Sequence, residues 1–381
     1  MKNAIKLLPL SIVFATSTSF AANYAVEARG DAMGGVGVVS ANFLTAPFYN
    51  PAITAIYRRN DDVGMITPSF GISFNDEGQM IDDLDRAQNL INSQNPANIG
   101  ELQTTLDSLQ GDKFKMEMGG VVAFAIPNQF IAANAFGKLY TESFVTPDIA
   151  TGSTNADPNA RTLENAANSK VNAVSIGVAE AGISLAKYQT FLGQHISYGI
   201  TPKLQRIYTY VYQANLSNYD FSDVRENGQA ETMLNFDAGF LWFHGPFRVG
   251  IAGTNLIARD IETKSVNSIS YAYELSPQYT VGAGIVADYF TFSVDYDLKE
   301  EERFTTFDDN VQMFRAGAEL DLLRQLKLRA GWKRNLAYEN SEDTLTAGIG
   351  LSPLNLFQLD IGASYTNENS MGAYINFLGS Y

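Results

Sequence analysis

The last third of the chain alternates between apolar and polar side chains over one segment after another. In residues 290–299 every even position is apolar and every odd position is polar, and the same period of two recurs in residues 325–334, 343–352 and 356–366. A period of two indicates β-strands with one apolar and one polar face. A water-soluble β-sandwich would show the same pattern, so the alternation alone does not say whether the apolar faces meet a protein core or lipid.

The first residues have the layout of a secretory signal peptide. Lys2 and Lys6 precede an apolar stretch over residues 7–14, and small residues end at Ala21, after which we expect cleavage. The alternative is a buried first helix. The apolar stretch is shorter than the roughly 20 residues that a transmembrane helix needs, and no later stretch comes close to that length. Any membrane span must therefore consist of strands.

Fourteen segments have the length and pattern of strands, and single-chain bacterial barrels have an even number. They are residues 62–75, 113–126, 129–143, 170–187, 193–214, 231–243, 246–257, 277–287, 290–299, 311–322, 325–334, 343–352, 356–366 and 370–379. Short turns alternate with much longer connections, as expected for short periplasmic turns and long outer loops. We therefore predict an all-β fold, a transmembrane antiparallel β-barrel of about 14 strands over residues 61–381.

The long outer connections are expected at residues 76–112, 144–169, 215–230, 258–276 and 300–310. In the first of them, apolar residues recur at steps of three and four, which predicts two short amphipathic helices. Met80, Ile81, Leu84 and Ile91 would either hold an apolar ligand at the barrel mouth or pack only on one another. Residues 155–168 are polar and rich in small side chains, so we expect a mobile loop there.

The composition argues against several classes of function. The chain has no cysteine, which excludes disulfides and thiol chemistry, and its two imidazoles, His195 and His244, belong to no recognisable catalytic or zinc motif. Asp82, Asp83 and Asp85 lack the spacing of a calcium-binding loop. We therefore expect no enzyme activity, no catalytic residue, no metal and no cofactor.

The charge balance argues against nucleic acid as a partner. The chain has 26 basic and 41 acidic residues, and removal of Lys2 and Lys6 with the signal peptide leaves 24 against 41, a net charge of −17. A strongly acidic protein repels the phosphate backbone.

A glycine-rich segment, residues 29–38, follows the signal peptide and leads to Asn50 and Pro51. Its glycines do not stand between a strand and a helix, so a dinucleotide-binding fingerprint is rejected. Glycine allows close approach of backbones. We predict that residues 22–60 form a plug inside the barrel; a flexible exported N-terminus is the alternative.

The spacing within this segment resembles the N-terminal hatch of the FadL-type outer-membrane transporters of hydrophobic compounds. The matching positions are Gly30, Ala32, Gly34, Gly35, Gly37, Asn50, Pro51 and Ala52. Residues 121–144 also resemble the second and third strands of that family, which carries a kink in its third strand beside which the wall opens sideways. The resemblance places this opening at Phe136 and Gly137, near Asn134. FadL-type barrels likewise have fourteen strands.

Two further resemblances concern the ends of the chain. The opening from Glu27 to Gly35 is also similar to a TraF-like family that is labelled after a conjugative-transfer operon; the thioredoxin-like TraF proteins are a different kind of chain. Residues 370–377, with Tyr381 as terminal aromatic, resemble the signal by which the barrel-assembly machinery recognises last strands. The chain is thus expected in the outer membrane of a Gram-negative bacterium, in contact with outer-membrane lipid.

The polar faces of the strands would line the lumen with charges of both signs. These charges would either pair and hold the barrel shut around the plug, or set ion selectivity in an open pore; their interleaving favours pairing. The resemblance implies a channel for hydrophobic small molecules such as long-chain fatty acids. The alternatives are a non-transporting barrel of TraF-like type, acting in conjugative transfer or surface assembly, and a general ion-conducting porin.

Overall fold

The structure is a computed structural model that describes residues 27–56, 64–126, 130–220, 227–267, 269–305, 307, 309–353 and 357–380. The expected signal peptide, residues 1–21, and Tyr381 lie outside the described residues.

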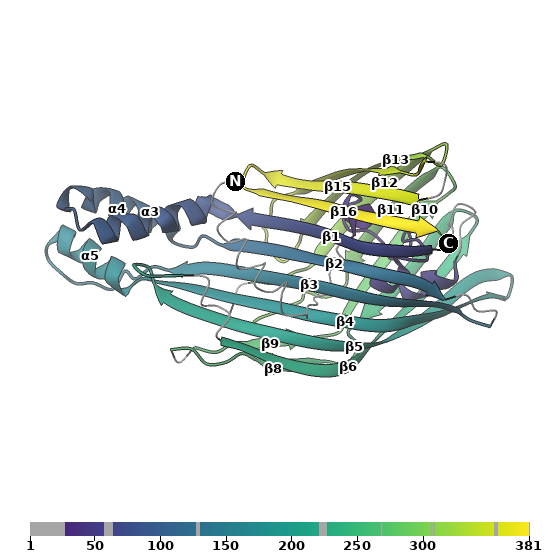
Figure 1. The fold of residues 1–381 in the computed structure, drawn as a ribbon, viewed down its shortest axis with the longest axis horizontal. Coiled ribbons are helices and arrows are strands. Elements are labelled where there is room, and N and C mark those ends of the chain that lie inside the picture. The colour runs from purple at the N-terminus through teal and green to yellow at the C-terminus, as the bar shows by residue number, and fades with distance from the viewer. Residues whose placement is uncertain are drawn as a thin grey trace.

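Fourteen strands form one closed antiparallel barrel, and β1 pairs with β16 to complete it (Figure 1). The strands are β1 (Gly64–Asp76), β2 (Phe114–Ile126), β3 (Ala132–Asp148), β4 (Lys170–Phe191), β5 (Gln194–Asn215), β6 (Gly228–His244), β7 (Phe247–Thr254), β10 (Gln278–Val286), β11 (Phe290–Asp297), β12 (Met313–Leu322), β13 (Leu326–Asn335), β14 (Thr344–Leu351), β15 (Phe357–Asn367) and β16 (Ser370–Ser380). The predicted strand number and antiparallel barrel are confirmed.

The barrel turns its apolar side chains outward. Leu345 is 60% exposed and Ile361 is 43% exposed, whereas Arg329 and Asp360, whose side chains point into the lumen, are 4% and 0% exposed. A water-soluble sandwich would bury the apolar face. Such a large apolar exterior suits a lipid environment, so the structure resolves the ambiguity of the alternating pattern.

The two ends of the barrel differ. At one end, here called the short-turn end, connections such as residues 192–193 and 323–325 join consecutive strands. At the other, here called the long-loop end, β3, β4 and β5 extend furthest, and three helices project beyond them (Figure 1). These helices are α3 (Met80–Ser93), α4 (Ile99–Leu109) and α5 (Pro158–Asn168), with short 3-10 turns η4 (Glu77–Gln79) and η5 (Pro96–Asn98) beside the first two. In the described part of the chain, no helix is long and apolar enough to cross a membrane.

The expectation of a mobile loop at residues 155–168 is wrong from Pro158 onward, where α5 begins. The Asp157 carboxylate accepts the N–H of Asn159 (3.0 Å) and Pro158 occupies the first helical position. This Asp-Pro pair is a helix start signal that the polar composition concealed. Thr162 and Ala166 then bury one face of the helix.

Two connections at the long-loop end fold into the lumen. A two-stranded sheet, β8 (Arg259–Glu262) and β9 (Ala272–Leu275), buries Ile261, Tyr273 and Leu275 against the inner faces of β4 and β5. The segment joining β11 to β12, described at residues 298–305, 307 and 309–312 and here called the strap, follows it inward. Phe304 of the strap is 0% exposed and forms a bridge with Tyr273 of β9.

Residues 27–56 lie inside the barrel near the short-turn end, in purple in Figure 1, and form the predicted plug. The plug contains α2 (Ala28–Asp31) and two 3-10 turns, η2 (Ala46–Phe48) and η3 (Pro51–Ala55). The apolar side chains of the plug are buried, and those of Met33, Phe43 and Ile53 are at most 1% exposed. The plug therefore supplies the core that the lumen of the barrel would otherwise lack.

Candidate functional site

The plug is folded around Tyr49. The phenol ring lies against Gly30 and Gly37, where any side chain would overlap it. The Tyr49 hydroxyl donates to Glu27 Oε1 (3.1 Å), and the same carboxylate accepts the N–H groups of Arg29 (3.0 Å) and Gly30 (2.6 Å) as the N-cap of α2. Two of the predicted hatch glycines are thus needed to seat one buried ring.

The plug also packs closely on the barrel wall. Gly34 and Gly35 have φ angles of 75° and 85°, in the left-handed region that favours glycine, and a Cβ at Gly34 would lie 2.7 Å from the carbonyl oxygen of Trp332. Facing glycines of the wall make the same close approach to plug residues; they are Gly199, Gly239, Gly282, Gly317, Gly331, Gly348 and Gly362. Backbone therefore lies on backbone around much of the lumen.

Asn50 and Pro51 fix the second half of the plug. Asn50 Oδ1 accepts the N–H of Ala52 (3.0 Å), and its Nδ2 donates to the carbonyl of Val38 (2.8 Å). Pro51 begins η3 and lies against Gly199 of β5. All six predicted hatch residues are therefore brought together in one packed unit.

An ionic network ties the plug to the wall. Arg29 binds Glu319 of β12 at 3.0 Å; Glu319 also binds Arg329 of β13 at 2.7 Å, and Arg329 binds Asp360 of β15 at 2.6 Å. All four residues are at most 5% exposed. The expectation that lumen charges pair and hold the plug is confirmed for this set.

Two carboxylates of β11 continue the attachment. Asp295 accepts the N–H groups of Gly37 (2.7 Å) and Val38 (3.0 Å) from the plug. Asp297 forms a two-bond ion pair with Arg315 of β12, at 2.8 and 3.0 Å. A separate buried group, Lys203 with Glu180 and Asp237, lies on β4 to β6.

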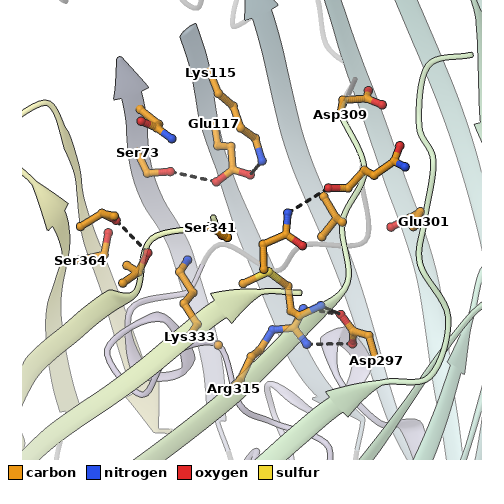
Figure 2. A pocket seen from close by; sticks show the side chains of 18 of the residues that line it. Ser73, Lys115, Glu117, Asp297, Glu301, Asp309, Arg315, Lys333, Ser341 and Ser364 are labelled. Atoms are coloured by element: carbon orange, nitrogen blue, oxygen red, sulfur yellow. Dashed lines mark hydrogen bonds and ion pairs between the residues drawn. The ribbon is translucent and has the colours of Figure 1, made fainter. Parts of the chain in front are cut away.

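Above the plug, toward the long-loop end, the lumen opens into a chamber of about 500 Å³ (Figure 2). Phe48 and Tyr49 belong to its plug side, and Phe144 of β3 adds a third aromatic surface. Lys333 lies between the Lys115–Glu117 pair and the Arg315–Asp297 pair in Figure 2. A volume of this size suits a small organic ligand, here with both aromatic and charged contacts.

The strap closes one side of the chamber and reaches across to β3. Arg303 of the strap forms an ion pair with Glu142, which is 0% exposed and also binds Lys115 at 2.7 Å. Phe304 packs edge to face on Tyr273, with 5.3 Å between ring centroids. The Asp309 carboxylate accepts the N–H groups of Arg303 (3.3 Å) and Phe304 (3.1 Å). The strap is thereby held to β3 and β9, and Asp309 fixes its own backbone.

Burial raises the pKa of Asp309 to about 7, against the opposing effect of the Arg303 guanidinium and with Glu142 acting in the same direction as burial. Because the ordinary pKa of an aspartate is about 3.9, the folded strap binds this proton more tightly than the unfolded strap does. The stability that this proton adds to the folded strap is therefore fully present below about pH 4, and it is lost as the pH rises toward 7.

We therefore expect a spin label at the exposed position 302, introduced as Glu302→Cys, to gain mobility between pH 5 and pH 8. The substitution Asp309→Asn, which removes the titration, should make the mobility independent of pH over this interval. The same pH response in both proteins would assign the change to another group.

An apolar cluster joins the plug side of the chamber to the barrel wall. Phe43, Leu44 and Phe48 of the plug form a cluster with Ile66, Val121 and Phe136 of the wall. Phe48 and Phe136 meet edge to face with 5.5 Å between centroids, and the side-chain amide nitrogen of Asn134 donates to the carbonyl of Phe43. Because Phe48 also lines the chamber, apolar surface is continuous from the chamber to β1, β2 and β3.

The expected kink at Phe136 and Gly137 is not found. β3 pairs without a register shift with both β2 and β4 through these residues. The wall is instead irregular in β1, where the register shifts between Thr67 and Phe70 against β16 and between Ile66 and Gly71 against β2. Pro68 lies within both shifts and has no N–H to donate to a ladder, so the proline accounts for the break.

The four residues predicted to capture ligand do not face the chamber. Met80, Ile81 and Leu84 are 0%, 4% and 0% exposed within the core between α3 and α4, and Ile91 packs at its edge. The alternative interpretation, helices that pack on one another, describes them correctly. Among the described residues, no group of three or more His, Asp or Glu side chains is placed to hold a metal ion.

Several site residues were missed from the sequence. Lys115, Glu117 and Glu142 stand on the inward faces of β2 and β3 at alternating positions, a signal that was available but not followed. Tyr49 and Phe48 lie between the hatch glycines and Asn50 and carry no signal of their own. Arg303 ends a run of charged residues in the expected outer connection 300–310, and such runs usually face water.

Solved structures share this fold over nearly the whole chain. A deletion mutant of the TodX monoaromatic hydrocarbon channel has a TM-score of 0.57 at 10% identity, covering 94% of this chain and 99% of that chain. The Pseudomonas putida toluene transporter TodX has a TM-score of 0.52 at 10% identity (94% and 98% covered). A Pseudomonas aeruginosa FadL homologue has a TM-score of 0.52 at 10% identity (95% and 99% covered). The fold is that of the FadL-type channels.

The family model described as "F plasmid transfer operon, TraF, protein" matches residues 47–297. The chain belongs to this family, so both resemblances noted in the sequence are confirmed. A comparison with curated proteins finds no match to the chain.

Proposed function

We propose that the protein is an outer-membrane channel of a Gram-negative bacterium for the uptake of hydrophobic small molecules, with long-chain fatty acids as substrates. The observation that carries the proposal is the continuous apolar surface that joins the chamber, through Phe48, to Phe136 and the irregular β1. The FadL-type fold supports it, because the similar structures named above are titled as channels and transporters. Uptake through such a barrel requires no catalytic residue.

The charges of the chamber favour a carboxylate-headed ligand over a plain hydrocarbon. Arg315 and Lys333 are directly opposite each other on β12 and β13, and both side chains line the chamber together with Lys115. Asp297 already binds Arg315 through two bonds, so the ligand carboxylate is placed beside Lys333, while the acyl chain lies on Phe48 and Phe144.

The exit is proposed through the side of the wall at Pro68 and Ser69 of β1. Ser69 replaces a ladder bond there by accepting the N–H of Val121 through its hydroxyl (2.8 Å). Asn134, Phe136 and Gly137 lie on β3, two strands from β1, and the Asn134 and Phe136 side chains contact the plug from the wall. Passage requires the plug to shift at Gly34 and Gly35, the residues in left-handed conformation.

The substitution Lys333→Met tests this ligand class. We expect the affinity of the purified protein for oleate to fall by about tenfold, because one charge-assisted hydrogen bond contributes about 1.5 kcal/mol. Binding of toluene, which has no charge, should stay within twofold. Lys264→Met, at an exposed loop position, is the matched control. Equal losses for oleate and toluene, or no loss for either, would contradict the carboxylate site.

A second function, a non-transporting component of conjugative transfer or surface assembly, is favoured by two observations. The family name refers to a transfer operon, and the plug is fixed by buried ion pairs on β12, β13 and β15. This function predicts a periplasmic or pilus protein that copurifies with the barrel, together with no ligand flux. Flux without a copurifying protein would reject it.

A further inference from the structure

The short turns present large apolar side chains instead of the usual polar ones. Leu192, between β4 and β5, is 85% exposed, and Leu323, between β12 and β13, is 86% exposed. Phe130 and Tyr289, at two further connections, are 83% and 62% exposed, and Phe247, the first residue of β7, is 56% exposed. Turn tips in water favour Gly, Asn, Asp and Ser, so an apolar residue at each of these four connections calls for an environment other than water.

Two of these residues occupy conformations that disfavour them. Leu192 has a φ angle of 49° and Leu323 a φ angle of 58°, each in a turn whose next residue, Gly193 or Arg324, also has positive φ. The two-residue turn at residues 192–193 has the shape that selects Asn-Gly or Asp-Gly, and in the three-residue turn at residues 323–325 the left-handed region is likewise unfavourable for a leucine side chain. Leucine is therefore placed at these tips at a conformational cost to the turn, and only contacts of its side chain can offset that cost.

The turns adjoin the apolar exterior of the barrel. Next to Leu323, Leu320 and Leu322 are 47% and 46% exposed, and next to Leu192, Phe191 is 63% exposed. On the outward face of the β4–β5 hairpin, the exposed Lys187 and Gln194 lie between Leu192 and the apolar residues Tyr198 and Ile200.

The height of the apolar exterior places the turns at a membrane border. Along β5 the outward face is apolar from Ile196 up to Leu204, with the polar Gln194 between Ile196 and the turn at Leu192; the next outward residue beyond Leu204 is Arg206, whose guanidinium lies 5.0 Å from the centre of the Tyr208 ring. The twelve residues from Leu192 to Leu204, at about 3.4 Å each and tilted by about 40°, rise roughly 30 Å. An outer-membrane barrel has an apolar band about 25 Å tall with an aromatic girdle at each border. Arg206 and Tyr208 fit one border and the leucine turns fit the other.

We propose that the short-turn end is a lipid contact surface, with Leu192 and Leu323 seated between the acyl chains and headgroups of the inner leaflet. The plug then opens directly at the membrane surface, without a vestibule beneath it. All of the protein outside the membrane stands on the opposite side, where β3 to β5 and the three helices project. A periplasmic protein docked on the same turns is the competing occupant.

The experiment uses the absence of cysteine from the chain. Leu192→Cys and Leu323→Cys are each labelled with a nitroxide, and the protein is placed in vesicles of phosphatidylethanolamine and phosphatidylglycerol. Leu204→Cys serves as the reference in lipid and Asp107→Cys, exposed on α4, as the reference in water. Collisions with oxygen, which enters lipid, are compared with collisions with a water-soluble nickel chelate.

We expect both turn positions to resemble position 204, with oxygen collisions severalfold above nickel collisions. Nickel access equal to that at position 107 overturns the proposal. If the nickel chelate reaches the turns in vesicles but not in native outer membranes, a protein covers the turns there, and the lipid assignment is equally wrong.

A second pair of variants separates turn geometry from lipid contact. Leu192→Asn and Leu323→Asn place the residue that hairpin turns favour, so both proteins should fold and keep or raise their thermal midpoint in detergent. In vesicles the midpoint should fall by several degrees, because the lipid contact is lost. An equal or higher midpoint in vesicles would contradict the proposal.

Discussion

Replacing Gly317 and Gly331 together with valine is expected to force the plug away from the wall and to raise the ion conductance of the barrel severalfold. A Cβ at Gly317 would overlap the carbonyl group of Met33, and a Cβ at Gly331 would overlap the carbonyl carbon of Met33 and the nitrogen of Gly34. The overlapping atoms are backbone, so no rotamer change relieves the clash. The least costly response is movement of the first turn of the plug, since the wall strands are fixed by hydrogen bonds on both sides.

The measurement is single-channel recording in planar bilayers. Gly379→Val is the matched control, because a Cβ at this glycine of β16 meets nothing within 4 Å. It should leave conductance at the level of the parent protein. A parent-like conductance in the double variant, with the barrel still folded, would show that the plug is not what closes the lumen.

Replacing Arg329 with methionine is expected to lower the free energy of unfolding by about 3–5 kcal/mol, because it leaves buried carboxylates without their partner. Arg329 bridges Glu319 and Asp360 at 2.7 and 2.6 Å, and its side chain is fully buried. Arg29 of the plug still neutralises Glu319, but Asp360 keeps no cation among its ion pairs. The substitution should therefore lower the stability of the barrel and also weaken the attachment of the plug to the wall.

Urea unfolding in vesicles measures this loss. Arg334 lies five residues from Arg329 along β13 and pairs with the exposed Asp343 at 3.5 Å, so Arg334→Met should cost less than about 1 kcal/mol. Similar losses for both variants would contradict the assignment of Arg329 as the centre of the network.

Much of the architecture could be predicted because it depends on local patterns. The alternation in residues 290–366 fixes which side chain of each strand faces lipid, and the contrast between short and long connections fixes the two ends. The glycines at 30, 34, 35 and 37 predicted a plug because only close packing needs them in that number. Tyr49, the ring that Gly30 and Gly37 accommodate, could not be identified, since nothing local shows which side chain fills the space.

The chamber could not be predicted, because it depends on contacts between distant residues. Arg303 and Glu142 are 161 positions apart, and nothing near Arg303 shows that its connection turns into the lumen. The break in strand pairing lies at Pro68 of β1, where the sequence carries a local signal because proline cannot donate to a ladder, whereas the resemblance places the side opening at Phe136 and Gly137 of β3.

The most direct test of the proposed channel is the uptake of oleate into vesicles with a lipopolysaccharide outer leaflet, which slows passive entry. A fatty-acid-binding fluorophore enclosed in the vesicles reports the oleate that enters. The proposal predicts saturable uptake that is faster with the folded protein than with the same protein unfolded by heat, and slower with Lys333→Met. Uptake at the rate of protein-free vesicles would contradict it.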